Sequence, residues 1–194
     1  ERSEIETVVR ENQTLAAAAI VNIYKHYVKK GNNTRILSPP EIAGRINELQ
    51  AAGITIHDGT FKRCSEGGER NVRGGSFEVE LAHEMDKNGR EVVAVGKRIE
   101  RSDADIIVGD NLVYEAKNYD LEHEDYSDYF WNYMFKQSIG KKVIKYIKDT
   151  NKELIVSLRS SSVPEEVRRS IEEVEEEHGV SIKIRADKGY VENE

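Results

Sequence analysis

Apolar residues recur along this chain at two spacings, one typical of helices and one typical of strands. In the N-terminal part, apolar positions four residues apart predict a helix over 5–28. A second helix is expected over 39–52, because Ser38 and Glu41 have the spacing of a capping box. Residues 54–56 alternate as a short strand would.

The stretch 61–75 has no apolar period and contains glycines and arginines, so we expect a loop-like linker there. The sequence then divides into an N-terminal helical extension (1–60), the linker (61–75) and a core (76–194). Two helices and a short strand in the extension either resemble a winged helix-turn-helix or form a plain helical cap.

The core shows an alternation of helices and strands that is typical of the α/β class. A helix capped by Ser76 is expected first, and a hairpin follows. The hairpin requires antiparallel neighbours, so the central sheet should be mixed and flanked by helices. The expected elements are helices over 77–85, 131–149 and 164–178, and strands over 91–95, 104–108, 112–117, 153–158 and 180–184.

Composition excludes some classes of protein. No apolar run approaches the ~18–20 residues of a membrane helix, so we expect no membrane partner. The single cysteine, Cys64, cannot form an internal disulfide, which favours an intracellular location, although a delivered toxin is also compatible. The chain begins with Glu1 rather than Met, as a fragment or processed form would.

The net charge of −7 argues at first against a polyanionic partner. Much of the acidic excess, however, lies in two segments, 120–128 and 172–177, which need not face such a partner. The charge therefore predicts a one-sided electrostatic surface and does not exclude a nucleic-acid-binding protein.

The strongest chemical signal is a charged triplet in the expected hairpin. With a three-residue loop at 109–111, Asp105 lies opposite Glu115, with Cβ atoms about 4.5–5.5 Å apart. Lys117 is two residues further and shares the face of Glu115. Like charges facing each other destabilise a sheet, so a divalent cation between the carboxylates is the economical interpretation. A hairpin whose polar face meets water is the alternative.

Asp105 followed after nine residues by Glu115-Ala116-Lys117 resembles the signature of the PD-(D/E)XK nuclease superfamily. The segment 74–81, which contains Glu78, is similar to the entry helix of archaeal Holliday-junction resolvases. The resemblance covers about residues 74–160 and implies a restriction-endonuclease-like core. It departs at Ala104, where proline is common, and the N-terminal extension has no counterpart in short resolvases.

The resemblance also implies roles for individual residues. Mg²⁺ or Mn²⁺ would be held by Asp105, Glu115, Glu78 and the carbonyl of Ala116, and Lys117 would assist the attacking water. Glu80 is the alternative helix acid, since it cannot share one helix face with Glu78. Gln137 occupies the zone in which superfamily members often place a further polar residue.

Basic residues lie on either side of this triplet in the sequence. Those before it are expected on a loop that rims the site and contacts a phosphate backbone, namely Lys97, Arg98 and Arg101. Those after it, Lys136, Lys141 and Lys142 among them, either contact phosphates or form a solvated helix face. The aromatic segment 126–135 is expected to pack in the core, a lid or a dimer surface, with base stacking as the alternative.

Together these features predict a Mg²⁺- or Mn²⁺-dependent endonuclease that acts on DNA rather than RNA, including branched DNA. A homodimer is expected by similarity to the resolvases. Two other interpretations remain at this point: a C-terminal nuclease toxin domain of a larger secreted protein, and a non-catalytic nucleic-acid-binding module with the same fold.

Overall fold

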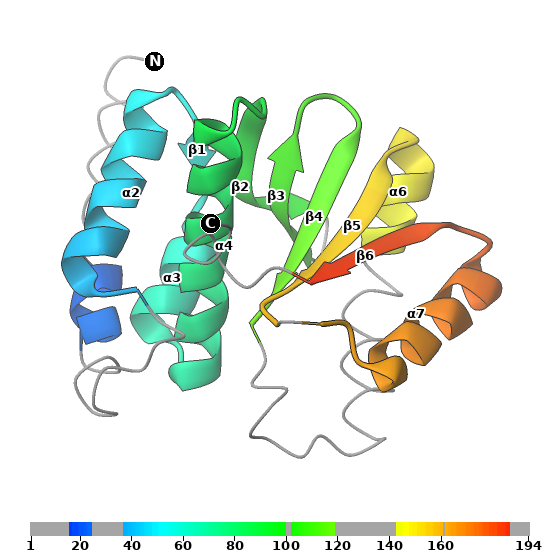
Figure 1. Ribbon diagram of the computed structural model, residues 1–194. Coiled ribbons are helices and arrows are strands. Elements are labelled where there is room, and N and C mark those ends of the chain that lie inside the picture. Colours follow the sequence, from blue (N-terminus) through cyan, green and yellow to red (C-terminus); the bar gives the residue numbers. More distant parts are fainter. Residues whose placement is uncertain (1–15, 25–36, 100–101, 119–142, 161, 187–194) are drawn as a thin grey trace.

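The computed structural model describes residues 16–24, 37–99, 102–118, 143–160 and 162–186 (Figure 1). Residues 16–24 are helical, in agreement with the predicted first helix. The other elements are α2 (Pro39–Ala51), β1 (Thr55–Ile56), α3 (Asp58–Glu66), α4 (Glu69–Lys87), β2 (Val92–Ile99), β3 (Ser102–Val108), β4 (Leu112–Lys117), α6 (Val143–Thr150), β5 (Glu153–Leu158), α7 (Glu165–His178) and β6 (Ile182–Ala186).

The strands form one six-stranded sheet in the order β1-β2-β3-β4-β5-β6. The central strands β2, β3 and β4 are antiparallel, whereas β1 pairs parallel with β2, and β5 and β6 continue parallel to β4. The α/β class and the mixed sheet are therefore confirmed. Among the described helices, none is both long and apolar enough to cross a membrane.

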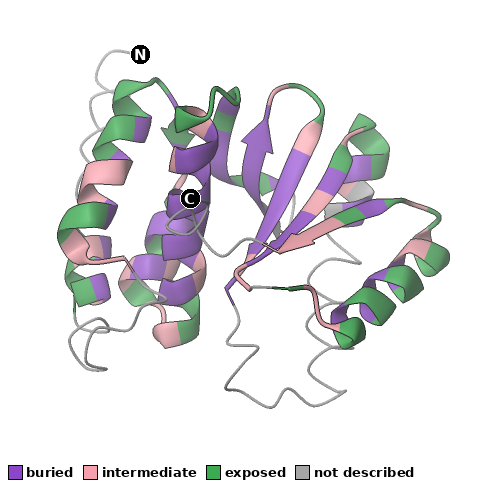
Figure 2. Cartoon of the chain, in the orientation of Figure 1, coloured by how far each residue is buried: buried purple, intermediate pink, exposed green. Residues whose placement is uncertain are grey.

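Helices cover both faces of the sheet (Figure 1). The segment 16–24 and helices α2, α3 and α4 build one hydrophobic cluster on one face, around Phe61 and Phe77. Helices α6 and α7 build the other, around Leu154 and Val156. Figure 2 shows that α4 is buried along most of its length, unlike the outer faces of α2 and α7. Helix α4 is thus the central helix of its layer.

The expected linker over 61–75 is wrong, because the chain there is helical. Helix α3 ends at Glu66, and α4 begins at Glu69 rather than after Ser76. The glycines suggested a loop, but Gly75 lies inside α4, where a Cβ atom would collide with the sulfur of Cys64 on α3. This glycine serves close helix packing instead of a turn.

The expected hairpin loop is confirmed, whereas the strand that precedes the hairpin, expected over 91–95, is longer than predicted. Leu112 pairs with Val108, as expected, and the bounds of β4 and β5 are those predicted. Strand β2, however, runs to Ile99, which is buried. Lys97 and Arg98 therefore lie on this strand, paired with β3, and not on a loop. Gly96 directly follows the predicted end of this strand and is a residue type that often marks a turn, but β2 continues through it with a φ of +65°.

Candidate active site

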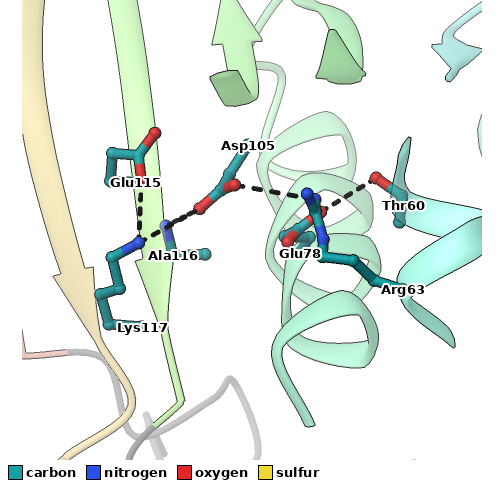
Figure 3. Close-up of polar contacts among 7 residues, drawn as sticks. All are labelled: Thr60, Arg63, Glu78, Asp105, Glu115, Ala116 and Lys117. Carbon is teal, nitrogen blue, oxygen red and sulfur yellow. Dashed lines mark hydrogen bonds and ion pairs between the residues drawn. The ribbon is translucent and has the colours of Figure 1, made fainter. Parts of the chain in front are cut away.

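Asp105 and Glu115 lie where the hairpin ladder between β3 and β4 ends. The last backbone pair is Ile106 with Tyr114, one step before the expected pairing of the two acids. Beyond it, Asp105 Oδ2 accepts a hydrogen bond from the amide of Ala116, at 2.9 Å (Figure 3). A side chain thus replaces the next backbone contact and holds the Asp105 carboxylate beside β4.

Lys117 joins the two acids on one side of the hairpin end. Its Nζ lies 2.9 Å from Glu115 Oε2 and 4.0 Å from Asp105 Oδ2 (Figure 3). The prediction that Glu115 and Lys117 share a face is confirmed. The other oxygen of Glu115, Oε1, is buried and has no hydrogen-bond partner among the described residues. Such a buried acceptor is a natural ligand for a cation.

Glu78 on α4 approaches the cluster from the side opposite Lys117 (Figure 3). Its Oε2 accepts hydrogen bonds from Arg63 Nη2, at 2.6 Å, and from Thr60 Oγ1, at 2.9 Å. The same Arg63 nitrogen lies 3.8 Å from Asp105 Oδ1. Arg63 and Thr60 belong to α3, so this helix contributes directly to the site.

Gly96 on β2 makes the approach of α3 to the sheet possible. It lies across from Asp105, between the pairs Val95–Ile106 and Lys97–Ala104. Its φ of +65° favours glycine, and a Cβ atom there would collide with the hydroxyl of Thr60. The glycine therefore lets Thr60 reach Glu78.

The electrostatics of the acids follow from their burial. Burial and the nearby negative charge of Asp105 raise the pKa of Glu115 to about 8, although Lys117 opposes the shift. Burial also raises the pKa of Glu78 to about 7, with Arg63 opposing and Asp105 adding to it. Crowded carboxylates with raised pKa values in one place are typical of functional sites.

Glu80, the alternative helix acid, lies in a different environment. Its Oε2 is 2.6 Å from Arg159 Nη1, and the Arg159 guanidinium also covers the Phe77 ring at 5.6 Å. Glu80 therefore anchors the end of β5 to α4, whereas Glu78 contacts the residues around Asp105. The two acids do not share a helix face, as expected.

The oxygen donors of this cluster fit a divalent ion only in part. Within the described residues, no three His, Cys, Asp or Glu side chains are grouped closely enough to hold a metal as they stand. Arg63 stands between Glu78 and Asp105 (Figure 3). Three donors fit an oxygen-seeking ion: the Asp105 carboxylate, the unpartnered oxygen of Glu115 and the Ala116 carbonyl. Glu78 fits as a further ligand only if it leaves Arg63.

The remaining predicted residues are not part of this cluster. Lys97 and Arg98 are exposed on β2. Several others lie outside the described residues, namely Arg101, Lys136, Gln137, Lys141 and Lys142, together with the segment 126–135. Sequence reasoning missed Thr60 and Arg63, because their segment was interpreted as an irregular turn and linker. An amphipathic pattern of Thr60, Phe61 and Cys64 was the available signal.

Comparison with known proteins adds no relative. No family model matches the chain, and neither the curated proteins nor the solved structures contain a significant match. The functional interpretation therefore depends on the residues and on the geometry described above.

Proposed function

We propose that this chain is a metal-dependent endonuclease of the PD-(D/E)XK type, with a restriction-endonuclease-like core formed by α4, the β2–β4 strands, α6 and β5. The observation that carries the proposal is the grouping of Asp105, Glu115 and Lys117 at the end of the β3–β4 ladder. The order of elements, with Glu78 on the helix that precedes the hairpin, supports the same assignment.

Mg²⁺ or Mn²⁺ would be held by the carboxylates of Asp105 and Glu115 and by the carbonyl of Ala116, with Glu78 as a further ligand after its release from Arg63. When bound, the ion would supply positive charge to the scissile phosphate and lower the pKa of a water molecule. The hydrogen bond from the Ala116 amide orients Asp105 and holds its carboxylate beside β4.

Lys117 is the residue proposed to contact the reacting groups. Its side chain is 13% exposed, so it is accessible while its charge is screened little by solvent. In the metal-free protein it compensates Glu115, and near a phosphate the same donors would stabilise the charge that develops during hydrolysis. It would also hold the attacking water by a hydrogen bond.

DNA is the proposed substrate in preference to RNA, and branched DNA is included. The exposed Lys97 and Arg98 offer positive charge on the strand next to β3. The acidic residues of α7 are mostly exposed on a helix of the other layer, which agrees with a one-sided distribution of charge. A homodimer, as in the resolvases that the sequence resembles, is part of this proposal.

Cleavage of supercoiled plasmid and of a four-way DNA junction, with Mg²⁺, Mn²⁺ or EDTA, tests the proposal. We expect metal-dependent cleavage that falls by about 100-fold or more in Glu115→Gln and Lys117→Ala. The matched controls are Glu153→Gln and Lys183→Ala, which break an exposed acid–lysine pair between β5 and β6. Cleavage that survives in EDTA, or in both site variants, would refute the assignment, and metal-independent binding without turnover would favour a non-catalytic module.

A further inference from the structure

Arg63 lies between two of the acids proposed to serve the metal ion. Its Nη2 atom is 2.6 Å from Glu78 Oε2 and 3.8 Å from Asp105 Oδ1. Figure 3 shows the guanidinium in the space between the helix that carries Glu78 and the strand end that carries Asp105. A cation of the protein itself therefore stands between two carboxylates that a divalent ion would bring together.

The charges of the cluster explain why a cation is needed there. Glu78, Asp105 and Glu115 are all buried, and buried carboxylates without compensating charge are costly. Lys117 compensates at the Glu115 side. Arg63 does the same at the Glu78 side, so within the described residues each end of the row of acids has a basic partner.

The two contacts of Arg63 differ in strength. Glu78 is held by the short ion pair and also by Thr60, at 2.9 Å. Asp105 is held on its other oxygen by the Ala116 amide, and its distance of 3.8 Å from Arg63 exceeds that of a hydrogen bond. Arg63 is also the most exposed of the three side chains, at 27% against 10% for Asp105 and 4% for Glu78. Its guanidinium can therefore withdraw toward solvent while the acids stay in place.

We infer that Arg63 is a built-in counter-cation of the metal-free site, and that a divalent ion and the Arg63 guanidinium are alternative neutralising charges for Glu78 and Asp105. This inference rests on the proposed metal site. Since the ion must displace the arginine from at least one acid, Arg63 lowers the affinity for the ion and keeps the empty site folded. Thermodynamic linkage requires that removal of one competitor strengthen the other.

Calorimetric titration of the full chain with Mn²⁺, without nucleic acid and at constant pH, tests the inference. We expect Arg63→Gln to bind Mn²⁺ at least about fivefold more tightly than wild type. In EDTA the variant should melt at a lower temperature than wild type, and Mn²⁺ should raise its Tm by more. The matched control is Arg45→Gln, which removes another arginine paired with a glutamate of α4, Glu84, at 3.2 Å; its Mn²⁺ affinity should not change.

Arg63→Lys provides a second variant if the glutamine variant does not fold. It keeps the positive charge, but the shorter lysine side chain ends in a compact ammonium group that does not reproduce the position of the guanidinium between Glu78 and Asp105, so we expect an intermediate gain in affinity. Weaker or unchanged Mn²⁺ binding in these variants, beside a wild type that binds Mn²⁺, would overturn the inference and leave the proposed function standing. A wild type that binds no Mn²⁺ would refute the metal site itself.

Discussion

The carboxylate of Asp105 on β3 accepts a hydrogen bond from the backbone amide of Ala116 on β4, with 2.9 Å between the two atoms. The backbone ladder of these strands ends at Ile106 and Tyr114, so the side chain extends the connection beyond it. The contact also holds Asp105 close to Lys117, which is paired with Glu115. One hydrogen bond thus serves both the fold and the proposed chemistry.

Comparison of Asp105→Asn with Asp105→Ala isolates this hydrogen bond. Both substitutions remove the negative charge, but only asparagine keeps an oxygen that can accept from the Ala116 amide. We expect the alanine variant to have a free energy of unfolding about 1–3 kcal/mol below that of the asparagine variant, because a buried amide is left unpaired. Urea denaturation in EDTA measures the difference. Equal stabilities would show that the contact contributes nothing to folding.

Gly75→Ala should destabilise the protein, whereas Gly74→Ala on the same helix should not. A Cβ atom at position 75 collides with Cys64, while at position 74 it meets no atom. We expect Gly75→Ala to lower the free energy of unfolding by about 1–3 kcal/mol through overpacking. Gly74→Ala should raise it by about 0.5–1 kcal/mol, since alanine favours the helix. Thermal denaturation of the two variants measures the difference in stability. Equal effects of the two substitutions would contradict the packing of α3 on α4.

The reactivity of Cys64 reports on the contact of α3 with α4 at Gly75. Burial raises the pKa of its thiol to about 12, and the charge of Glu78 adds to the shift. The native protein should therefore react slowly with an aromatic disulfide reagent at pH 8, at a rate limited by opening of the structure. We expect faster labelling in Gly75→Ala than in Gly74→Ala. Rapid labelling of the wild type would show that the thiol is accessible.

Substitution of Glu80 should change the stability of the protein, whereas substitution of Glu78 should change its affinity for Mn²⁺. Glu80→Gln breaks the buried pair with Arg159 and should cost about 3 kcal/mol of unfolding free energy, with the Mn²⁺ affinity of the folded protein unchanged. Glu78→Gln should lower the Mn²⁺ affinity, because Glu78 is proposed as a further ligand of the ion and shares Arg63 with Asp105. Urea denaturation and calorimetry of both variants test this. A loss of Mn²⁺ affinity confined to Glu80→Gln would reverse the two assignments.

The stability of the metal-free protein should fall as the pH rises from about 4.5 to about 8. The pKa values of Glu78 and Glu115 are raised from 4.5 to about 7 and about 8, so in this window the folded state binds more protons than the unfolded state. Linkage then makes the free energy of unfolding decrease with pH. Below the window the two carboxyls are protonated in the folded and the unfolded state alike, so the free energy of unfolding no longer changes with pH and their full contribution to stability is present. The lowered pKa of Glu48, about 2, acts only at lower pH.

Urea denaturation in EDTA at several pH values measures this slope. Glu115→Gln removes one of the two groups and should make the decrease with pH shallower. The control Glu153→Gln, at an exposed pair with Lys183, should leave the slope unchanged. A stability that rises across the window, or a slope that Glu115→Gln leaves unaltered, would show that the buried carboxylate is ionised without cost.

The sequence was most informative where local pattern determines structure. Strands β4 and β5 have the predicted bounds, because apolar runs that end at turn residues define them. The three-residue loop then fixes Val108 opposite Leu112, and this register brings Asp105 close to Glu115. The proximity of these acids to Lys117 was therefore predictable from the hairpin alone.

The helix side of the site was not predictable in the same way. Arg63 and Thr60 contact Glu78 only because Gly75 and Gly96 permit α3 to approach α4 and β2. Glycine in a sequence indicates a turn as readily as close packing, and only the neighbouring element distinguishes the two. The pair of Glu80 with Arg159 joins residues far apart in the chain, and no local pattern reveals such a contact.

The proposed activity requires above all that Asp105 and Glu115 hold one divalent ion. Anomalous diffraction from crystals of the wild-type chain grown with Mn²⁺ tests this directly. We expect one manganese peak ligated by both carboxylates and by the Ala116 carbonyl, with Arg63 withdrawn from Asp105. A site without manganese at saturating concentration, or manganese bound only elsewhere while Lys117 still pairs with Glu115, would contradict it.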